Sequence, residues 1–154
     1  MPLRNVPERQ AATLADLIEL REGQVSSCAL ARDAGVDMTL LAFAAGEGVS
    51  EEEYFGDTLY YVVEGRAAVV LPDRRVVLRA GEAMKVAAHV LHAVECAADR
   101  DDVGSDDTGL AVVGSDHAGS ADAALGVAAS VPDAEGTASA ASVGFKLLQI
   151  TLHA

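Results

Sequence analysis

Short apolar runs rich in β-branched residues recur between residues 24 and 96, and turn-forming residues separate them. The turns contain the sequences Asp-Ala-Gly, Gly-Glu-Gly, Glu-Gly, Leu-Pro-Asp and Ala-Gly-Glu. Short strands at regular spacing with such turns are typical of an all-β sandwich or barrel. The pattern predicts strands at residues 24–32, 36–45, 58–63, 67–71, 75–79 and 91–96.

A short helical turn is expected before the first strand, over residues 14–20. Thr13 precedes this turn, and a threonine hydroxyl can accept a hydrogen bond from an unpaired backbone amide at the start of a helix. We expect the segment to cover an edge of the barrel rather than to carry a function.

Two glycine-framed segments carry the most specific pattern in the chain. Gly46 or Gly48 opens the first segment and Gly65 closes it, whereas Gly81 opens the second segment, which contains His92. Together these segments resemble the paired motifs of small single-domain cupins, in which a histidine stands at the position of His92.

The resemblance covers about residues 25–96 and resumes at residues 145–152, which are similar to the last barrel strand of such proteins. It implies an all-β fold, namely a cupin-type double-stranded β-helix (jelly-roll barrel) with a short N-terminal helical segment. It also implies a metal site inside the barrel.

The residues at the usual metal-binding positions differ from those of the family. Counted back from the closing glycine, Glu52 and Tyr54 replace two histidines and Thr58 replaces a glutamate, so that only His92 keeps its expected type. The usual Pro-x-Gly turn of the second motif is also replaced, by residues 87–89. The resemblance therefore implies a cupin with a degenerate metal site.

Side chains alternate across a strand, so the family register would bring these four positions into one interior. One of the neighbouring residues Tyr60 and Tyr61 should also face inward, and the acidic run 51–53 leaves open which carboxylate does so. The expected ligand-binding pocket contains Glu52, Tyr54, Thr58, Tyr60, Met84, His89 and His92. Catalytic residues cannot be assigned from this pattern.

Metal binding stays open as an alternative. Catalytic metal sites generally use three protein ligands, whereas His92 and Glu52 are the only good donors here, with Tyr54 as a third that would need to lose its proton. We therefore predict no cofactor, and keep a divalent metal ion held by these three residues as the alternative. For His92 we favour a neutral core histidine bonded to Tyr54 or Glu52.

The composition is that of one domain with a core of small side chains. The chain has 154 residues, of which 51% are hydrophobic and only 4% aromatic, and it has no tryptophan. Such a length can bury one core. We expect its few large residues to be Phe43, Phe55, Tyr60, Tyr61 and Phe145.

The formal net charge of −13 argues against nucleic acid and anionic membranes as partners, because both bind basic surfaces. The acidity fits a high-salt cytoplasm or an ordinary acidic protein equally well. We find no leader sequence and no apolar stretch long enough for a bilayer, so a cytoplasmic location is expected. The two cysteines, Cys28 and Cys96, are expected to be reduced.

Residues 97–143 are rich in Ala, Gly, Ser and Asp and separate the strand containing His92 from the last strand. We interpret them as a surface loop inserted into one cupin domain of residues 1–154. Residues 103–109 recur in similar form as residues 113–119, which suggests duplication within the insertion.

Three functions fit these observations. The first, which we favour, is metal-free binding of a small molecule inside the barrel. The second is an enzyme, either metal-dependent through a substitute ligand set or an acid–base isomerase, that uses His92 with Glu52 and Tyr54. The third is a non-catalytic association module. A homodimer is expected in each case, because pairing covers the exposed strand edges of an open barrel.

Overall fold

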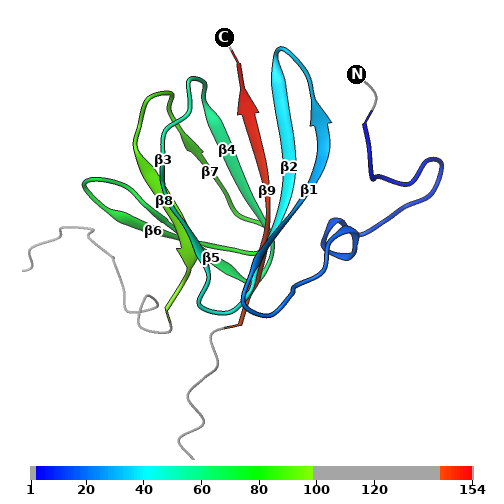
Figure 1. The fold of residues 1–154 in the computed structure, drawn as a ribbon, viewed down its shortest axis with the longest axis horizontal. Coiled ribbons are helices and arrows are strands. Elements are labelled where there is room, and N and C mark those ends of the chain that lie inside the picture. Colours follow the sequence, from blue (N-terminus) through cyan, green and yellow to red (C-terminus); the bar gives the residue numbers. More distant parts are fainter. Residues whose placement is uncertain (1–2, 99–142, 154) are drawn as a thin grey trace, which may run out of the picture.

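The computed structural model describes residues 3–98 and 143–153. In these residues two antiparallel sheets pack face to face (Figure 1), as expected for a cupin barrel. One sheet has the strand order β1 (Val25–Arg32), β2 (Val36–Phe43), β9 (Phe145–Leu152), β4 (Thr58–Glu64) and β7 (Ala83–Val86). The other has the order β3 (Gly48–Glu52), β8 (His92–Cys96), β5 (Arg66–Val70) and β6 (Arg75–Arg79).

The last strand of the chain lies in the middle of the five-stranded sheet. β9 pairs with β2 along its full length, from Val36 opposite Leu152 to Phe43 opposite Phe145. On its other side it pairs with β4, where Tyr60 lies opposite Gln149. The sheet is therefore continuous only when the C-terminal strand is in place.

Close backbone approach requires glycine at two turns. Gly65 joins β4 to β5 with a φ of +78°, a conformation that side-chain-bearing residues rarely adopt. Gly56 lies against the end of β9, and a Cβ atom there would be only 1.4 Å from the carbonyl oxygen of Leu152. The loop between β3 and β4 is thus packed directly against the C-terminal strand.

The main core lies between the two sheets. Strand alternation selects it: Tyr60 and Val62 of β4 are buried, whereas Tyr61 between them is half-buried on the opposite face. The rings of Phe43 and Phe145 stack at its centre, 4.4 Å apart and within 8° of parallel. The buried residues of this inner cluster are Phe43, Tyr60, Val62, Ala67, Val69, Leu78, Val86, Val94, Phe145 and Leu147.

The prediction that Phe55 belongs to the core is wrong, because 83% of its surface is exposed. Phe55 lies in the loop between β3 and β4, where no strand alternation directs the side chain inward. The edge of its ring instead meets the ring of His89, at a centroid distance of 5.7 Å.

A second apolar cluster covers the outer face of the five-stranded sheet. It contains Ile18, Leu30, Leu40 and Ala42. The N-terminal segment lies beside β1 (Figure 1), and the backbone amide of Arg4 donates a hydrogen bond to the Leu30 carbonyl. The segment therefore covers the outer face of the sheet and not only an edge of the barrel, as the sequence had led us to expect.

The helical turn is shorter than expected. It is a single 3-10 turn, η1 (Leu14–Leu17), because Ile18 already has an extended backbone. Thr13 precedes η1 without a side-chain capping bond. The turn is held instead by Lys146, whose buried Nζ donates a hydrogen bond to the Ala15 carbonyl at 2.8 Å.

The strand predictions agree with the structure to within two residues at each end, except that β3 and β7 were not among them. Both cysteines are free and half-buried. The predicted insertion at 97–143 falls almost wholly in residues 99–142, which lie outside the described residues, and so does its internal repeat. Over residues 3–98 and 143–153, no helix has the length and apolar character needed to cross a membrane.

Candidate functional site

A cavity of about 200 Å³ lies between the two sheets. Its apolar wall consists of Leu41, Phe43, Val49, Val94 and Leu147. Its polar lining consists of Glu52, Tyr54, Tyr60 and Gln149, which lie toward the end of the barrel where β3 and β9 end and β4 begins. An apolar enclosure with a few convergent polar groups is the usual form of a small-molecule site.

A larger depression of about 560 Å³ lies on the outside, between η1 and the start of β1. It is lined by residues of mixed character, including Asp16, Glu19, Arg21 and Ser26. None of the side chains expected in the pocket lies there. We therefore take the inner cavity as the candidate site.

Tyr60 and His92 form a buried polar pair behind the cavity. The Nδ1 atom of His92 lies 2.7 Å from the Val90 carbonyl oxygen, which can only accept, so Nδ1 carries a proton. In the neutral ring Nε2 then accepts a hydrogen bond from the Tyr60 hydroxyl, also at 2.7 Å. His92 is thus a hydrogen-bonded core histidine, but its partner is Tyr60 and not Tyr54 or Glu52 as expected.

Glu52 and Tyr54 form a second polar pair at the cavity mouth. The Tyr54 hydroxyl donates a hydrogen bond to Oε2 of the exposed Glu52 carboxylate. Burial, together with the hydrogen bond to Glu52 and the negative charge of that residue, raises the pKa of Tyr54 from 10.0 to about 12. Burial also raises the pKa of Tyr60. Both phenols therefore keep their protons at neutral pH.

The remaining expected pocket residues do not line this cavity. Thr58 is buried and pairs its hydroxyl with that of Thr151 at 3.2 Å. Met84 lies opposite Tyr60 on β7 and packs against the inner cluster. His89 has a left-handed backbone with a φ of 62° and its ring binds Glu53 outside the barrel, with Nδ1 3.1 Å from Oε1.

The structure adds Gln149 to the site. Along β9 the side chains at positions 145, 147, 149 and 151 share one face, and Phe145 and Leu147 on this face are buried in the core. Gln149 is the amide in this inward row, and it lines the cavity opposite Tyr60. A polar residue in an otherwise inward-facing apolar position was the signal that could have identified it.

The residues at the usual cupin ligand positions do not fit a metal ion. Both ring nitrogens of His92 already have partners, Thr58 binds Thr151, and Tyr54 keeps its proton while bound to Glu52. Within residues 3–98 and 143–153, no three His, Cys, Asp or Glu side chains are grouped closely enough to hold a metal.

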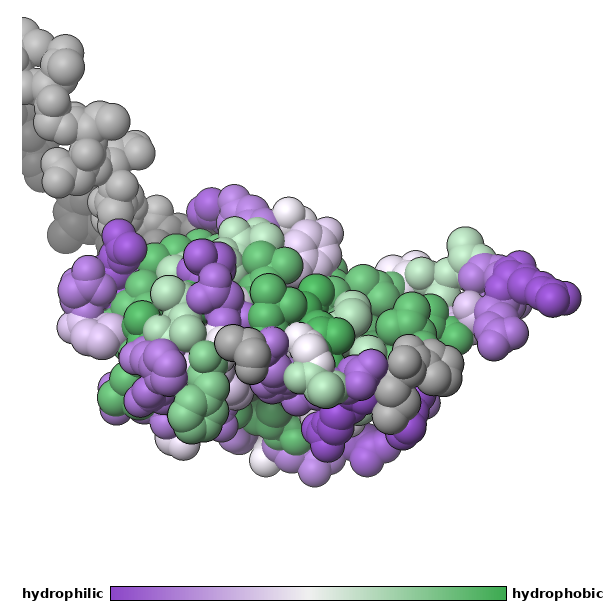
Figure 2. Space-filling view, turned by 90° about the horizontal axis from the view of Figure 1, so that it is seen from above, coloured by the Kyte–Doolittle hydropathy of each residue, from purple (hydrophilic) through white to green (hydrophobic). Residues whose placement is uncertain are grey.

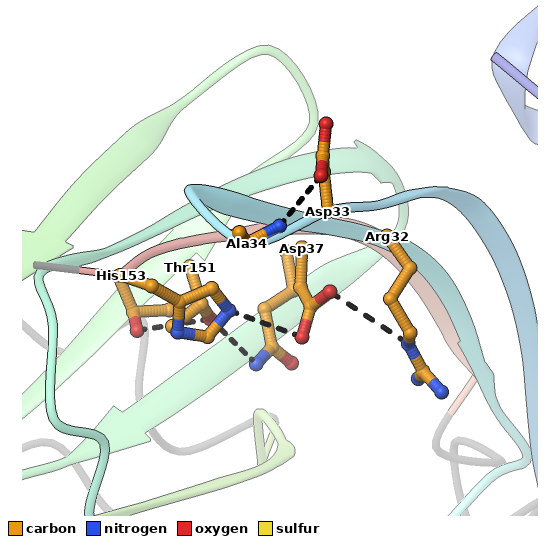
Figure 3. Close-up of polar contacts among 8 residues, drawn as sticks. Arg32, Asp33, Ala34, Asp37, Thr151 and His153 are labelled. Atoms are coloured by element: carbon orange, nitrogen blue, oxygen red, sulfur yellow. Dashed lines mark hydrogen bonds and ion pairs between the residues drawn. The ribbon is translucent and has the colours of Figure 1, made fainter. Parts of the chain in front are cut away.

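A separate polar group lies at the turn between β1 and β2 (Figure 3). Oδ2 of Asp37 lies 3.2 Å from Nε2 of His153, and its Oδ1 lies 3.6 Å from Nε of Arg32. Asp33 accepts a hydrogen bond from the Ala34 amide at 2.7 Å. These contacts tie the end of β9 to the first hairpin, and none of these residues lines the cavity.

Comparison with solved structures identifies the class of the protein. A cupin superfamily protein from Desulfitobacterium hafniense is 33% identical, with a TM-score of 0.67 over 99% of this chain and 98% of that chain. A conserved protein of unknown function from Streptococcus pyogenes has the same TM-score at 12% identity, over 100% of this chain and 96% of that one. The chain belongs to the cupin superfamily. No protein-family model matches it, and no curated protein does.

Proposed function

We propose that this cupin binds a small molecule in the cavity between its sheets. The observation that carries the proposal is the enclosure itself: about 200 Å³ with an apolar wall and a polar side formed by Glu52, Tyr54, Tyr60 and Gln149. Burial of the ligand's apolar part would supply affinity, and the polar groups would fix its orientation.

Acid–base catalysis by His92 has less support. The imidazole does not line the cavity, and both of its nitrogens are engaged, one by Tyr60 and one by the Val90 carbonyl. A catalytic base must reach the proton that it removes, directly or through one water. His92 in this position supports the ring of Tyr60, which does line the cavity.

Fluorotyrosine labelling with fluorine NMR tests binding directly. The chain has three tyrosines. Tyr54 and Tyr60 line the cavity, whereas Tyr61 lies on the other face of β4 and serves as an internal control. Titration with small neutral probes such as cyclohexanol and isobutanol should shift the Tyr54 and Tyr60 signals saturably and leave Tyr61 in place. Tyrosine-to-phenylalanine variants assign the signals.

A cavity-filling variant provides the control. Val49→Phe places a ring at a half-buried wall position and should abolish the shifts, while Leu59→Phe adds the same ring on an exposed position outside the cavity and should not. Melting temperatures confirm that both variants fold. If none of the probes moves Tyr54 or Tyr60 in the unmodified protein, or if Val49→Phe leaves the shifts intact, the cavity is not a binding site.

A further inference from the structure

We infer that the cavity selects small organic cations, with the positive charge held between the Glu52 carboxylate and the rings of Tyr54 and Tyr60. This inference rests on the proposed binding function and adds the class of ligand to it. It follows from the charge, the hydrogen-bond capacity and the shape of the lining.

The charge of the lining has one sign. Glu52 is the one charged residue among those that line the cavity, and its sequence neighbours Glu51 and Glu53 are exposed carboxylates. No lysine, arginine or histidine is part of the lining. An anionic ligand would therefore lose its hydration without gaining a partner charge, whereas a cation would gain one.

Glu52 is both oriented and available. The Tyr54 hydroxyl donates to Oε2 and fixes the carboxylate at the mouth. Oε1 has no protein partner in the described part of the chain. An ionised carboxylate has several acceptor positions, so a ligand ammonium can bind Oε1 while the bond from Tyr54 stays intact.

The aromatic residues favour a cation beside this carboxylate. Tyr54 and Tyr60 line the same small space as Glu52. A cation within about 6 Å of a ring face is attracted by the ring quadrupole, and the effect is larger when water is excluded. The Tyr60 hydroxyl already donates its proton to Nε2 of His92, so Tyr60 offers a ligand its ring rather than a hydrogen-bond donor.

The rest of the cavity limits the ligand to a compact molecule with an apolar body. The wall opposite the polar groups is formed by aliphatic residues and Phe43. About 200 Å³ is below the ordinary range for drug-sized ligands, which is roughly 300–1,000 Å³. A polyol would find few partners along this apolar wall, because the polar groups of the lining lie at one end of the cavity.

Three probes of the same shape but different charge test the inference. Choline carries a trimethylammonium group. Its neutral isostere, 3,3-dimethylbutan-1-ol, has a tert-butyl group in place of the trimethylammonium group. The third probe, tert-butylacetate (3,3-dimethylbutanoate), carries the tert-butyl group on a carboxylate anion. Affinities are measured by titration calorimetry and by the fluorine signals of Tyr54 and Tyr60. We expect choline to bind about tenfold more tightly than the neutral isostere, and tert-butylacetate to bind most weakly.

Matched variants assign the preference to one carboxylate. Glu52→Gln keeps the size of the side chain and an acceptor for Tyr54, and should reduce the preference for choline to about twofold or less. Glu51→Gln removes a neighbouring charge that does not line the cavity and should leave the preference unchanged.

The outcomes separate this inference from the proposed function. Equal binding of choline and its isostere, tighter binding of tert-butylacetate, or a preference that survives Glu52→Gln overturns the cation inference but leaves cavity binding in place. Cyclohexanol binding without choline binding has the same meaning. If neither the neutral nor the charged probes bind, the proposed function itself fails and the inference fails with it.

Discussion

The two faces of the five-stranded sheet both carry an apolar cluster, yet only the inner face borders a cavity enclosed between the sheets. The outer face is closed by the N-terminal segment, with Ile18 packed against Leu30, Leu40 and Ala42. The inner face meets the second sheet across a cavity of about 200 Å³. Figure 2 shows that hydrophobic residues also reach the surface at the end of the barrel seen from above, between hydrophilic borders.

The difference follows from how each face is covered. A short chain segment can adjust its position until its side chains pack closely against a sheet. Two packed sheets, by contrast, stay about 10 Å apart, because the hydrogen-bonded strands within each sheet cannot move separately. The facing sheet contributes small residues, such as Ala67 and Val69, which do not fill that space. The low aromatic content of the chain thus leaves room for a ligand on the inner face.

The largest expected effect comes from the inner face. Phe145→Ala removes a fully buried ring that stacks on Phe43, and should lower the free energy of unfolding by about 3–5 kcal/mol. Urea denaturation followed by circular dichroism measures this. A loss below about 1 kcal/mol would mean that the side chains of the inner face repack freely, and would contradict the view that the two sheets are held at a fixed distance.

A variant of Lys146, the residue next to Phe145, tests how the outer face is covered. Lys146→Met keeps the apolar stem but removes the ammonium that binds the Ala15 carbonyl, and should cost about 1–3 kcal/mol because the buried carbonyl loses its partner. Hydrogen exchange should show faster opening of residues 14–18. The control Glu64→Gln removes only the partly exposed carboxylate 3.6 Å away and should cost less than about 1 kcal/mol. Unchanged exchange in residues 14–18 would contradict this role of Lys146.

A smaller effect is expected at the polar pair behind the cavity. Tyr60→Phe leaves Nε2 of the buried His92 without its donor and should cost about 1–2 kcal/mol. Tyr61→Phe changes the adjacent half-buried side chain on the other face and should cost less than about 0.5 kcal/mol. Equal losses in the two variants, measured by urea denaturation, would show that the buried pair contributes nothing specific.

The smallest effect is confined to alkaline solution. Because the pKa of Tyr54 rises to about 12 in the folded protein, the unfolded chain loses this proton first, near pH 10. The contribution of Tyr54 to the free energy of unfolding is therefore fully present below about pH 10 and is lost as the pH rises toward 12. The melting temperature of Tyr54→Phe should fall less steeply over this interval, with a remaining slope from Tyr60, whose pKa burial also raises. Parallel curves would contradict the assignment.

The strand pattern and the glycine frame predicted the barrel, and strand alternation alone indicated that Tyr60 or Tyr61 faces inward. The structure places Glu52 and Tyr54 together at the cavity, where the cupin register would put them. These predictions succeeded because side-chain period and turn geometry are local properties of the chain. The homodimer and the cytoplasmic location stay predictions.

The details that sequence could not give depend on contacts between distant strands or on loop conformation. The pairing of His92 with Tyr60 requires the spacing between two sheets. His89 has a left-handed backbone conformation, and its side chain points away from the barrel. The exposed ring of Phe55 contacts the ring of His89 there. Neither conformation leaves a periodic signal in the sequence.

The central place of β9 has a consequence for synthesis of the chain. Until residues 145–152 leave the ribosome, β2 and β4 each lack a hydrogen-bonding neighbour on one side. A nascent chain at that stage presents two open strand edges, which are templates for pairing with other chains. Closing the sheet then requires a long-range encounter, which is expected to slow the formation of the barrel. Aggregation through these two edges is therefore expected to compete with folding until β9 is in place.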